Sequence, residues 1–255
     1  MIVALANQKG GVGKTTTAVN LAGYVAATGR RVLLIDLDPQ GNAATCLGIA
    51  KHGIDVTVGE VLLGEVAPRE AIQSSGRPGY DLLPATTDLA GVAVRLVELP
   101  RREHRLRDAL REVEDYYEYI LIDCPPSLGL LTINGLVAAE QVVIPLQCEY
   151  LALEGLAQLK QTIDLVRMQL NPRLHIAGVV MTMFDGRVNL AQQVVGEVRR
   201  YFPHRIFDTL IPRNVRLSEA PSHGELIAEY DPASRGARAY RALADELLQR
   251  EEVRQ

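Results

Sequence analysis

The sequence predicts an α/β fold in which a doubly wound, mostly parallel sheet is covered by helices on both of its faces. Short aliphatic runs alternate with longer segments of helical periodicity along most of the chain. The runs at 32–35 and 119–122 are almost continuously apolar, as strands buried on both faces are. A glycine-rich loop also joins the first run to the first helical segment, a recurring unit of parallel sheets.

The order of these runs predicts the elements. Strands are expected at 2–7, 31–36, 80–84, 118–123, 141–146, 174–182 and 206–211. Helices are expected at 15–28, 56–63, 86–96, 102–115, 129–139, 150–169, 188–202 and 234–250. The segment 64–79 is rich in Gly, Pro and Ser, which predicts a surface excursion. No low-complexity linker or internal repeat interrupts the pattern, so a single domain over residues 1–255 is expected.

Composition is that of an ordinary globular protein, with 47% hydrophobic and 23% charged residues. The formal net charge of −4 argues against nucleic-acid binding over the whole surface, so any DNA contact requires a local basic patch. Cys46, Cys124 and Cys148 lack metal-ligand spacing and are expected to be reduced thiols. The chain opens on strand-like residues, and no apolar run approaches the ~20 residues of a membrane span. We therefore expect a cytoplasmic protein.

The loop after the first strand predicts a binding site for a polyphosphate. Its glycines let consecutive backbone N–H groups turn inward, and the positive end of the following helix attracts the same anion. Lys14 is placed as a mobile cation for the β- and γ-phosphates, and the Thr15 hydroxyl is placed to bind Mg²⁺. A glycine-rich turn that binds nothing is the structural alternative. The residues expected to bind the nucleotide are Lys9, Gly10, Gly11, Val12, Gly13, Lys14, Thr15 and Thr16.

Two carboxylates follow at the end of the second expected strand. Asp36 is its last residue, and Asp38 stands two positions later, before Pro39. The carboxyl ends of parallel strands form the ligand-binding side of open α/β sheets. This position predicts a catalytic role for Asp38. Capping of a helix by Asp38, with Pro39 as the first helical residue, is the structural alternative.

The strand expected at 118–123 ends in Asp123 after four apolar residues. This is the Walker B arrangement, in which a carboxylate at a strand end binds the Mg²⁺ shell through water. Four aliphatic residues and an aspartate are weak evidence alone. They gain weight here because they follow the phosphate loop and the Asp36–Asp38 pair in the chain order that such sites have.

Lys9 stands where an ordinary phosphate-binding loop has its first glycine, so the loop reads K-G-G-x-G-K-T. In this form it resembles the deviant Walker A motif of the ParA/MinD ATPases. The chain has only four lysines, and two of them lie in this loop. The resemblance extends over essentially all 255 residues, with the family's motifs in order. It implies a P-loop NTPase fold, ATP hydrolysis with ATP and Mg²⁺ as cofactors, and an ATP-dependent homodimer.

The same resemblance implies roles for single residues. Lys9 reaches across the dimer interface to the partner's nucleotide, and it acts with Lys14 in catalysis. Asp38 orients or activates the hydrolytic water, and the Pro-Pro-Ser run at 125–127 responds to the γ-phosphate. The implied metal residues are Thr15, Asp36 and Asp123. The implied adenine contacts are Pro212 and Asn214, for which a simple strand-to-loop transition is the structural alternative.

Two arginines are candidates for DNA contact. The segments 185–190 and 212–221 closely resemble the chromosomal ParA proteins called Soj, in which arginines matching Arg187 and Arg216 bind DNA in the dimer. Residues 187–241 contain nine arginines against six acidic residues, so this stretch is locally basic. An arginine fork donates two parallel hydrogen bonds to a phosphate. Solvated helix faces or intramolecular ion pairs are the structural alternatives for these arginines.

Family members differ in their second ligand, and two other classes stay open at this point. A MinD-like membrane-associated regulator is the main alternative, but residues 237–252 have an apolar stripe suited to packing and an acidic end, without a basic face for lipid. We therefore expect no membrane binding. A cluster-carrying redox protein requires paired cysteines, which the spacing of the three thiols does not provide.

These observations predict a slow ATPase that acts as a switch in chromosome or plasmid partitioning. The ATP-bound homodimer is expected to bind nonspecific double-stranded DNA on the nucleoid. ParB, a centromere-binding protein, is the expected partner that stimulates hydrolysis. No helix-turn-helix precedes the loop, so the expected DNA contacts are dominated by phosphates and weaken steeply with salt.

Overall fold

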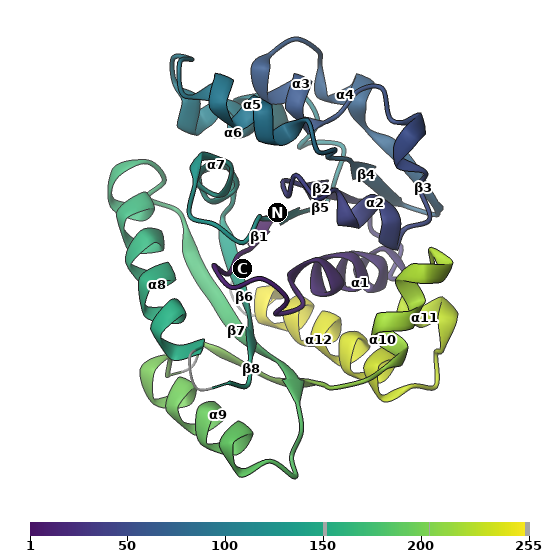
Figure 1. The fold of residues 1–255 in the computed structure, drawn as a ribbon, viewed down its shortest axis with the longest axis vertical. Coiled ribbons are helices and arrows are strands. Elements are labelled where there is room, and N and C mark those ends of the chain that lie inside the picture. The colour runs from purple at the N-terminus through teal and green to yellow at the C-terminus, as the bar shows by residue number, and fades with distance from the viewer. Residues whose placement is uncertain (150–151, 204, 253–255) are drawn as a thin grey trace.

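The computed structural model describes residues 1–149, 152–203 and 205–252, and its centre is an eight-stranded sheet of order β3-β4-β2-β5-β1-β6-β7-β8 (Figure 1). Paired strands are parallel except β3 and β4, which are antiparallel. The strands are β1 (Ile2–Leu5), β2 (Val32–Asp36), β3 (Gln73–Arg77), β4 (Tyr80–Leu83), β5 (Tyr119–Asp123), β6 (Gln141–Gln147), β7 (His175–Phe184) and β8 (Ile206–Pro212). The predicted fold class is confirmed.

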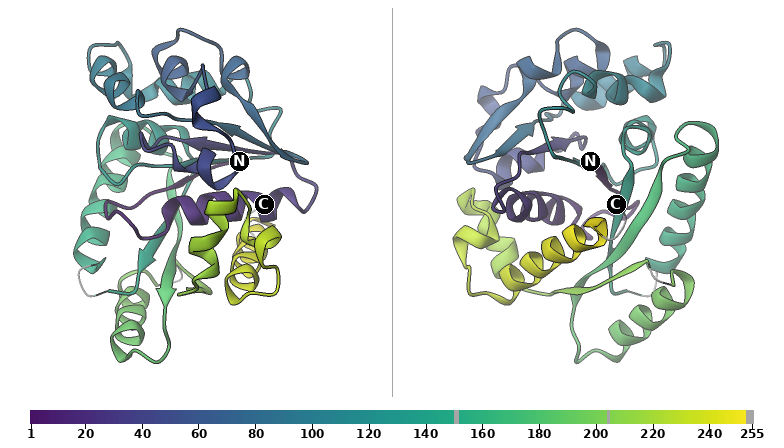
Figure 2. Two further views of the ribbon diagram at one scale, coloured as in Figure 1. Left: turned by 45° about the vertical axis from the view of Figure 1, so that its right-hand side comes forward. Right: turned by 180° about the vertical axis from the view of Figure 1, so that it is seen from behind.

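Helices pack on both faces of the sheet, and each face has its own apolar core (Figures 1 and 2). One face carries α1 (Lys14–Ala26), α2 (Asn42–Cys46), α10 (Arg216–Glu219), α11 (Ile227–Tyr230) and α12 (Arg235–Glu252). The other carries α3 (Val58–Leu63), α4 (Pro68–Ala71), α5 (Leu89–Leu96), α6 (Arg105–Leu110), α7 (Leu130–Ala138), α8 (Ala152–Gln169) and α9 (Asn189–Tyr201). β2 and β5 are buried along their whole length, as their apolar sequences predict.

The segment 64–79 is more ordered than predicted. It contains α4 and the edge strand β3, which a turn at 78–79 joins to β4. This turn favours glycine at position 79, because the backbone there has a φ of +69°, which glycine adopts without strain. The buried Ser75 hydroxyl donates to the carbonyl of Tyr80 at 2.6 Å, so a polar strand is held by hydrogen bonds in place of apolar packing. The segment thus lies at the surface, as predicted, but it forms a short helix and an edge strand that the sequence did not indicate.

Two expected helices differ in extent. The helix expected at 102–115 is a 3₁₀ turn at Arg102–His104 followed by the short α6, and its remainder forms turns. The helix expected at 150–169 is observed from Ala152, and residues 150 and 151 lie outside the described residues. The C-terminal helix packs through its predicted stripe, because Tyr240, Leu243 and Leu247 are buried.

Strand order gathers most of the predicted residues at one edge of the sheet. Asp36 at the end of β2 pairs in register with Asp123 at the end of β5, which pairs in register with Leu5 at the end of β1. Phe184 at the end of β7 likewise pairs with Pro212 at the end of β8. We call the edge formed by the loops after these strands the carboxyl rim.

Candidate nucleotide-binding site

The phosphate loop at the carboxyl rim leaves room for a ligand. Gly11 and Gly13 have φ values of +73° and +85°, which glycine adopts without strain. A Cβ atom added at Gly10, Gly11 or Gly13 would meet no described heavy atom within 4 Å. α1 begins at Lys14 with no side-chain cap and no acidic residue in its first turn, so its leading N–H groups can accept an anion.

Side chains from the rest of the sheet fix the shape of this loop. The Thr182 hydroxyl of β7 donates to the carbonyl of the buried Val12 at 2.8 Å. Asn7 donates to the carbonyl of Pro145 at 2.7 Å and accepts the N–H of Lys9 at 3.0 Å. The loop is therefore anchored to β6 and β7 and is organised before a ligand binds.

The two loop lysines lie in different surroundings. Lys14 is only 6% exposed, and its ammonium group donates to the carbonyl of Lys9 at 3.1 Å. Burial lowers the pKa of Lys14, and the nearby Asp123 and Asp38 carboxylates oppose that shift. Lys9 is half-exposed and forms an ion pair with the carboxylate of Glu149. Lys14 thus faces the acidic rim, whereas Lys9 points to a partner that the sequence did not suggest.

Asp123 provides the strongest sign of a cation-binding site. It is buried, and neither of its carboxylate oxygens has a hydrogen-bond partner among the described residues. Burial and the charge of Asp36 raise the pKa of Asp123 well above its usual value. Thr15 and Lys14 oppose that shift, although the Thr15 hydroxyl does not reach hydrogen-bond geometry with the carboxylate. An orphaned buried carboxylate beside a threonine hydroxyl fits a hydrated Mg²⁺.

Asp36 and Asp38 form a connected turn. Asp36 is fully buried and accepts the backbone N–H groups of Asp38 at 2.9 Å and of Ala43 at 3.0 Å. Burial raises the pKa of Asp36 to about 7, although these hydrogen bonds oppose the shift. Asp38 is half-buried and accepts the N–H of Gln40 at 3.0 Å. The N-cap of α2 is Gly41, so the alternative in which Asp38 caps that helix was wrong.

A pocket of about 260 Å³ lies beside the phosphate loop and contains both residues predicted to contact adenine. It is lined by Gly13, Thr16, Thr182, Met183, Ile211, Pro212, Arg213, Asn214, Leu217, Ser218, Pro221 and Tyr240. Sequence reasoning missed Met183, which has a φ of +51° inside β7, and Tyr240, whose hydroxyl lies 3.1 Å from that of Thr17. Nothing in the sequence near Met183 signals this backbone conformation.

Arg187 and Arg216 follow the neighbouring strands β7 and β8 at the carboxyl rim. The Arg187 side chain is 89% exposed and pairs with Asp185 at 2.7 Å. The Arg216 side chain is 53% exposed and pairs with Glu219 at 2.9 Å and Asp231 at 3.4 Å. Both guanidinium groups therefore have intramolecular partners and remain accessible to a phosphate.

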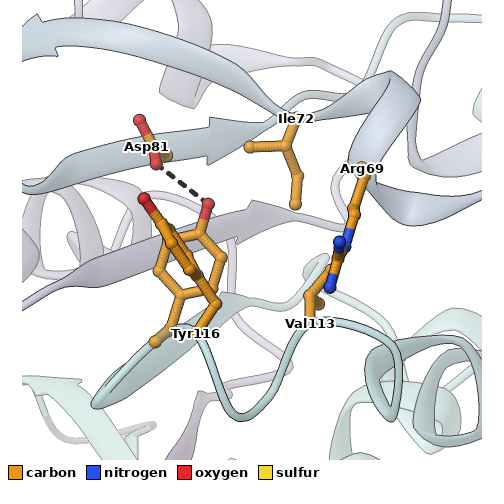
Figure 3. Close-up of a pocket in the computed structure, with 6 residues that line it drawn as sticks. Arg69, Ile72, Asp81, Val113 and Tyr116 are labelled. Atoms are coloured by element: carbon orange, nitrogen blue, oxygen red, sulfur yellow. Dashed lines mark hydrogen bonds between the residues drawn. The ribbon is translucent and has the colours of Figure 1, made fainter.

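A second pocket of about 300 Å³ contains no predicted site residue (Figure 3). Its lining is Arg69, Ile72, Asp81, Val113, Tyr116 and Tyr117, and the Tyr117 hydroxyl donates to the Asp81 carboxylate at 2.9 Å. Asp81 lies near the start of β4, so the pocket is at the amino ends of the strands, away from the carboxyl rim.

The three cysteines are free thiols, and burial raises the pKa of Cys46 and of Cys148 to about 11. Across residues 1–149, 152–203 and 205–252, no three His, Cys, Asp or Glu side chains are grouped to hold a metal ion. In the same ranges no helix has the length and hydrophobicity of a membrane span.

The chain is similar to known proteins over most of its length. A family model described as an AAA domain matches residues 1–176. The chain is 54% identical over 250 residues to the chromosome partitioning protein ParA of Myxococcus xanthus, with 98% of this chain and 88% of that protein covered. It is 54% identical over 246 residues to the sporulation initiation inhibitor protein Soj of Bacillus subtilis, with 96% and 97% covered. A solved structure of cobyrinic acid a,c-diamide synthase from Mycobacterium smegmatis, with bound ATP analog and magnesium, is similar with a TM-score of 0.88, 40% identity, and 100% and 96% coverage.

Proposed function

Because this chain belongs to the ParA/MinD family of P-loop ATPases, we propose that it is a partitioning ATPase whose nucleotide controls its hold on DNA. The observation that carries the proposal is the phosphate loop with Lys14 and the orphaned Asp123 at one rim, in a chain 54% identical to the chromosome partitioning protein ParA of M. xanthus. The M. smegmatis structure, which holds an ATP analog and magnesium on the same fold, supports ATP and Mg²⁺ as the cofactors.

Nucleotide binding uses groups that the fold already presents. The N–H groups at the start of α1 and the Lys14 ammonium surround the polyphosphate. When bound, Mg²⁺ would supply positive charge beside the phosphate oxygens. Thr15 and Asp123 would hold the ion. Asp36, the third predicted metal residue, would support the site by fixing the neighbouring turn, because both of its oxygens accept backbone N–H groups. The pocket beside Thr16, with Pro212 and Asn214 in its lining, takes the adenine ring.

Hydrolysis is assigned to Asp38. It stands on a turn fixed by Asp36, at the rim where Lys14 and Asp123 meet. A half-buried carboxylate at that place can orient the attacking water. Turnover of the isolated protein is slow in this proposal, and a ParB partner on centromere DNA stimulates it.

Dimerisation gives Lys9 its role. In the single chain Lys9 pairs with Glu149, and both side chains remain about half-exposed. When two ATP-bound protomers face each other, each Lys9 leaves this pair and reaches the partner's phosphates. The dimer also brings Arg187 and Arg216 of both chains onto one surface, where doubling a weak site raises the apparent affinity for DNA. Such a protein resides in the cytoplasm on the nucleoid.

The DNA contact is tested by plasmid co-sedimentation with ATP, ADP or no nucleotide. Arg187→Ala and Arg216→Ala should each lower ATP-dependent retention at least tenfold while ATP-dependent dimers persist in light scattering. Arg200→Ala is the matched control, because Arg200 is exposed on α9 and pairs with Glu197. If all three variants are retained on plasmid DNA like the wild type, the proposal that Arg187 and Arg216 contact DNA is wrong. Sedimentation with liposomes in place of plasmid would support the MinD-like alternative.

A further inference from the structure

Arg77, the last residue of β3, joins separate parts of the chain through one guanidinium group. Its Nε and one Nη donate to the two carboxylate oxygens of Glu229, both at 2.7 Å. The other N–H groups donate to the carbonyls of Leu47 at 3.2 Å, Ser75 at 3.1 Å and Gly224 at 2.9 Å. All five donors have partners, and the side chain is only 17% exposed. This arginine therefore acts as a fixed structural junction.

On one side, the junction leads to the turn that carries Asp38. Asp36 accepts the N–H groups of both Asp38 and Ala43, so one carboxylate holds the turn and the first residues of α2 together. At the other end of α2, the Leu47 N–H donates to the Ala43 carbonyl at 3.1 Å, and the Leu47 carbonyl accepts Arg77. α2 is thus a short rigid link between the Asp38 turn and Arg77.

On the other side, the junction leads to residues 216–231, here called the Arg216 segment. Glu229, which Arg77 grips, also accepts the N–H of Leu226 at 2.8 Å. Burial alone would raise the pKa of Glu229. The hydrogen bonds from Arg77 and from the Leu226 amide outweigh burial, so this pKa lies below its usual value. Within the same segment, Glu219 accepts the Tyr230 hydroxyl at 3.2 Å and pairs with Arg216.

The Arg216 segment also touches α2 and α1 directly. A Cβ atom added at Gly224 would lie 2.5 Å from the Cα of Gly48, so the two backbones are in contact. Asn20 of α1 donates to the carbonyl of Thr16 at 2.8 Å and accepts the N–H of Ile227 at 2.9 Å. The segment is therefore anchored to the phosphate loop through Asn20 and linked to the Asp38 turn through α2 and Arg77.

We infer that Arg77 is a positioning residue that couples the Asp38 turn to the Arg216 segment, so that the bound nucleotide sets the placement of Arg216. A guanidinium fork is planar and its donors are fixed relative to one another. A shift of α2 therefore moves the Leu47 carbonyl, Arg77 and the carbonyl of Gly224 together. The consequence for DNA rests on the proposed function, and by linkage DNA at Arg216 then changes the affinity of the protein for ATP.

Hydrogen–deuterium exchange with a nonhydrolysable ATP analogue and with ADP tests the coupling without DNA. In the wild type, exchange at 38–47 and at 216–231 should both differ between the two nucleotides. In Arg77→Gln the difference at 38–47 should remain, and the difference at 216–231 should fall by at least half, since the Gly48–Gly224 contact and Asn20 still join the segment to α2 and α1. Glu229→Gln is the second variant and should behave alike. Arg95→Gln, which removes an exposed ion pair with Glu65, is the control and should match the wild type.

A nucleotide-dependent difference at 216–231 that falls by less than half in both junction variants would overturn the inference, as would its absence in the wild type. Loss of the response at 38–47 in Arg77→Gln would also overturn it, because Arg77 would then act on the turn itself. In a parallel plasmid-binding assay, the ratio of DNA affinity with the ATP analogue to that with ADP should fall at least tenfold in Arg77→Gln. A wild type that shows no such ratio contradicts DNA binding as the proposed function, while the exchange result still decides the coupling.

Discussion

At the scale of single residues, the site depends on carboxylates that are costly to bury. Asp36 and Asp123 lie in register on β2 and β5, and both are fully buried. Asp36 uses its two oxygens on backbone N–H groups, whereas Asp123 uses neither oxygen on a described residue. A polar group left in this state lowers stability by about 1–3 kcal/mol. The unpaired carboxylate of Asp123 therefore supports the proposal that a ligand binds there, since the fold itself gains no hydrogen bond from it.

Asp123→Asn should make the nucleotide-free protein more stable and less active. Removing the buried charge should raise the free energy of unfolding by about 1–3 kcal/mol at pH 7.5. Mg²⁺-dependent ATP turnover should fall at least a hundredfold. Urea unfolding and phosphate release measure the two effects. Asp208→Asn, on an exposed position of β8, is the control and should change neither. A destabilised Asp123→Asn variant would contradict the assignment of an orphaned carboxylate.

The raised pKa values of Asp36 and Asp123 predict an unusual pH dependence. Each group has a higher pKa in the folded state than the value near 3.9 of an unfolded aspartate, so the folded protein binds more protons above about pH 4. Their contribution to stability is therefore complete at low pH and is lost as the pH rises through about 7 for Asp36. Without nucleotide or Mg²⁺, the wild type should lose more stability from pH 5 to 7.5 than Asp123→Asn, with a difference on the order of 1 kcal/mol. Equal losses in urea unfolding would show that Asp123 does not titrate in this range.

At the scale of elements, the turn from β2 into α2 requires glycine at one position. Gly41 has a φ of +60°, and a Cβ atom there would lie 2.5 Å from the carbonyl oxygen of Ala85. A side chain therefore displaces the turn that holds Asp38. The phosphate loop should keep its position when this turn moves, because Thr182 anchors that loop separately.

Gly41→Ala should separate binding from hydrolysis. ATP affinity should stay within threefold, because the phosphate loop is unchanged, and the turnover number should fall at least tenfold as Asp38 moves. Gly29→Ala is the matched control: Gly29 has a φ of +89° but no described atom within 4 Å of an added Cβ. It should lose about 1–2 kcal/mol of stability from backbone strain and keep normal turnover. Equal turnover in the two variants would rule out the steric argument.

Elements with continuous apolar sequence were predictable, and elements held by polar contacts were not. β2 and β5 follow from their aliphatic runs, and α12 follows from its stripe. β3 has no apolar side chain and is held through Ser75 and Arg77, so its residues read as a loop. α2 and the short helices of the Arg216 segment span four or five residues, which is too short for a periodic pattern.

The same distinction applies to the site. The fixed spacing of the motifs made it predictable that Lys14, Thr15 and Asp123 lie together at the carboxyl rim, where they are proposed to bind the nucleotide and Mg²⁺. The pairing of Lys9 with Glu149 and the contacts of Arg77 with Leu47, Gly224 and Glu229 join residues far apart in the chain. Such contacts depend on the order of strands in the sheet, which no local pattern contains.

At the scale of the whole molecule, ATP should govern association. The variant Asp38→Ala keeps the phosphate loop and the Asp123 carboxylate, but it lacks the carboxylate that is proposed to orient the attacking water. It should therefore accumulate as an ATP-bound dimer on DNA, with turnover lowered at least a hundredfold. Light scattering with ATP should show dimers that persist for hours, whereas the wild type returns to monomers. Only monomers under saturating ATP would contradict the proposed switch, and Lys14→Ala, which should not bind ATP productively, is the monomeric control.

The position of β7 and β8 at one end of the sheet has an evolutionary consequence. The residues proposed to bind and hydrolyse ATP follow β1, β2 and β5 in the middle of the sheet. The loops that contain Arg187 and Arg216, at 185–187 and 213–216, follow β7 and β8 at one end of it. The loop at 185–187 can diverge without disturbing the nucleotide site, whereas Arg213 and Asn214 also line the proposed adenine pocket and are constrained by it. A lineage can thus acquire a new binding partner by changing exposed positions at 185–187, and a protein engineer can do the same by grafting that one short loop.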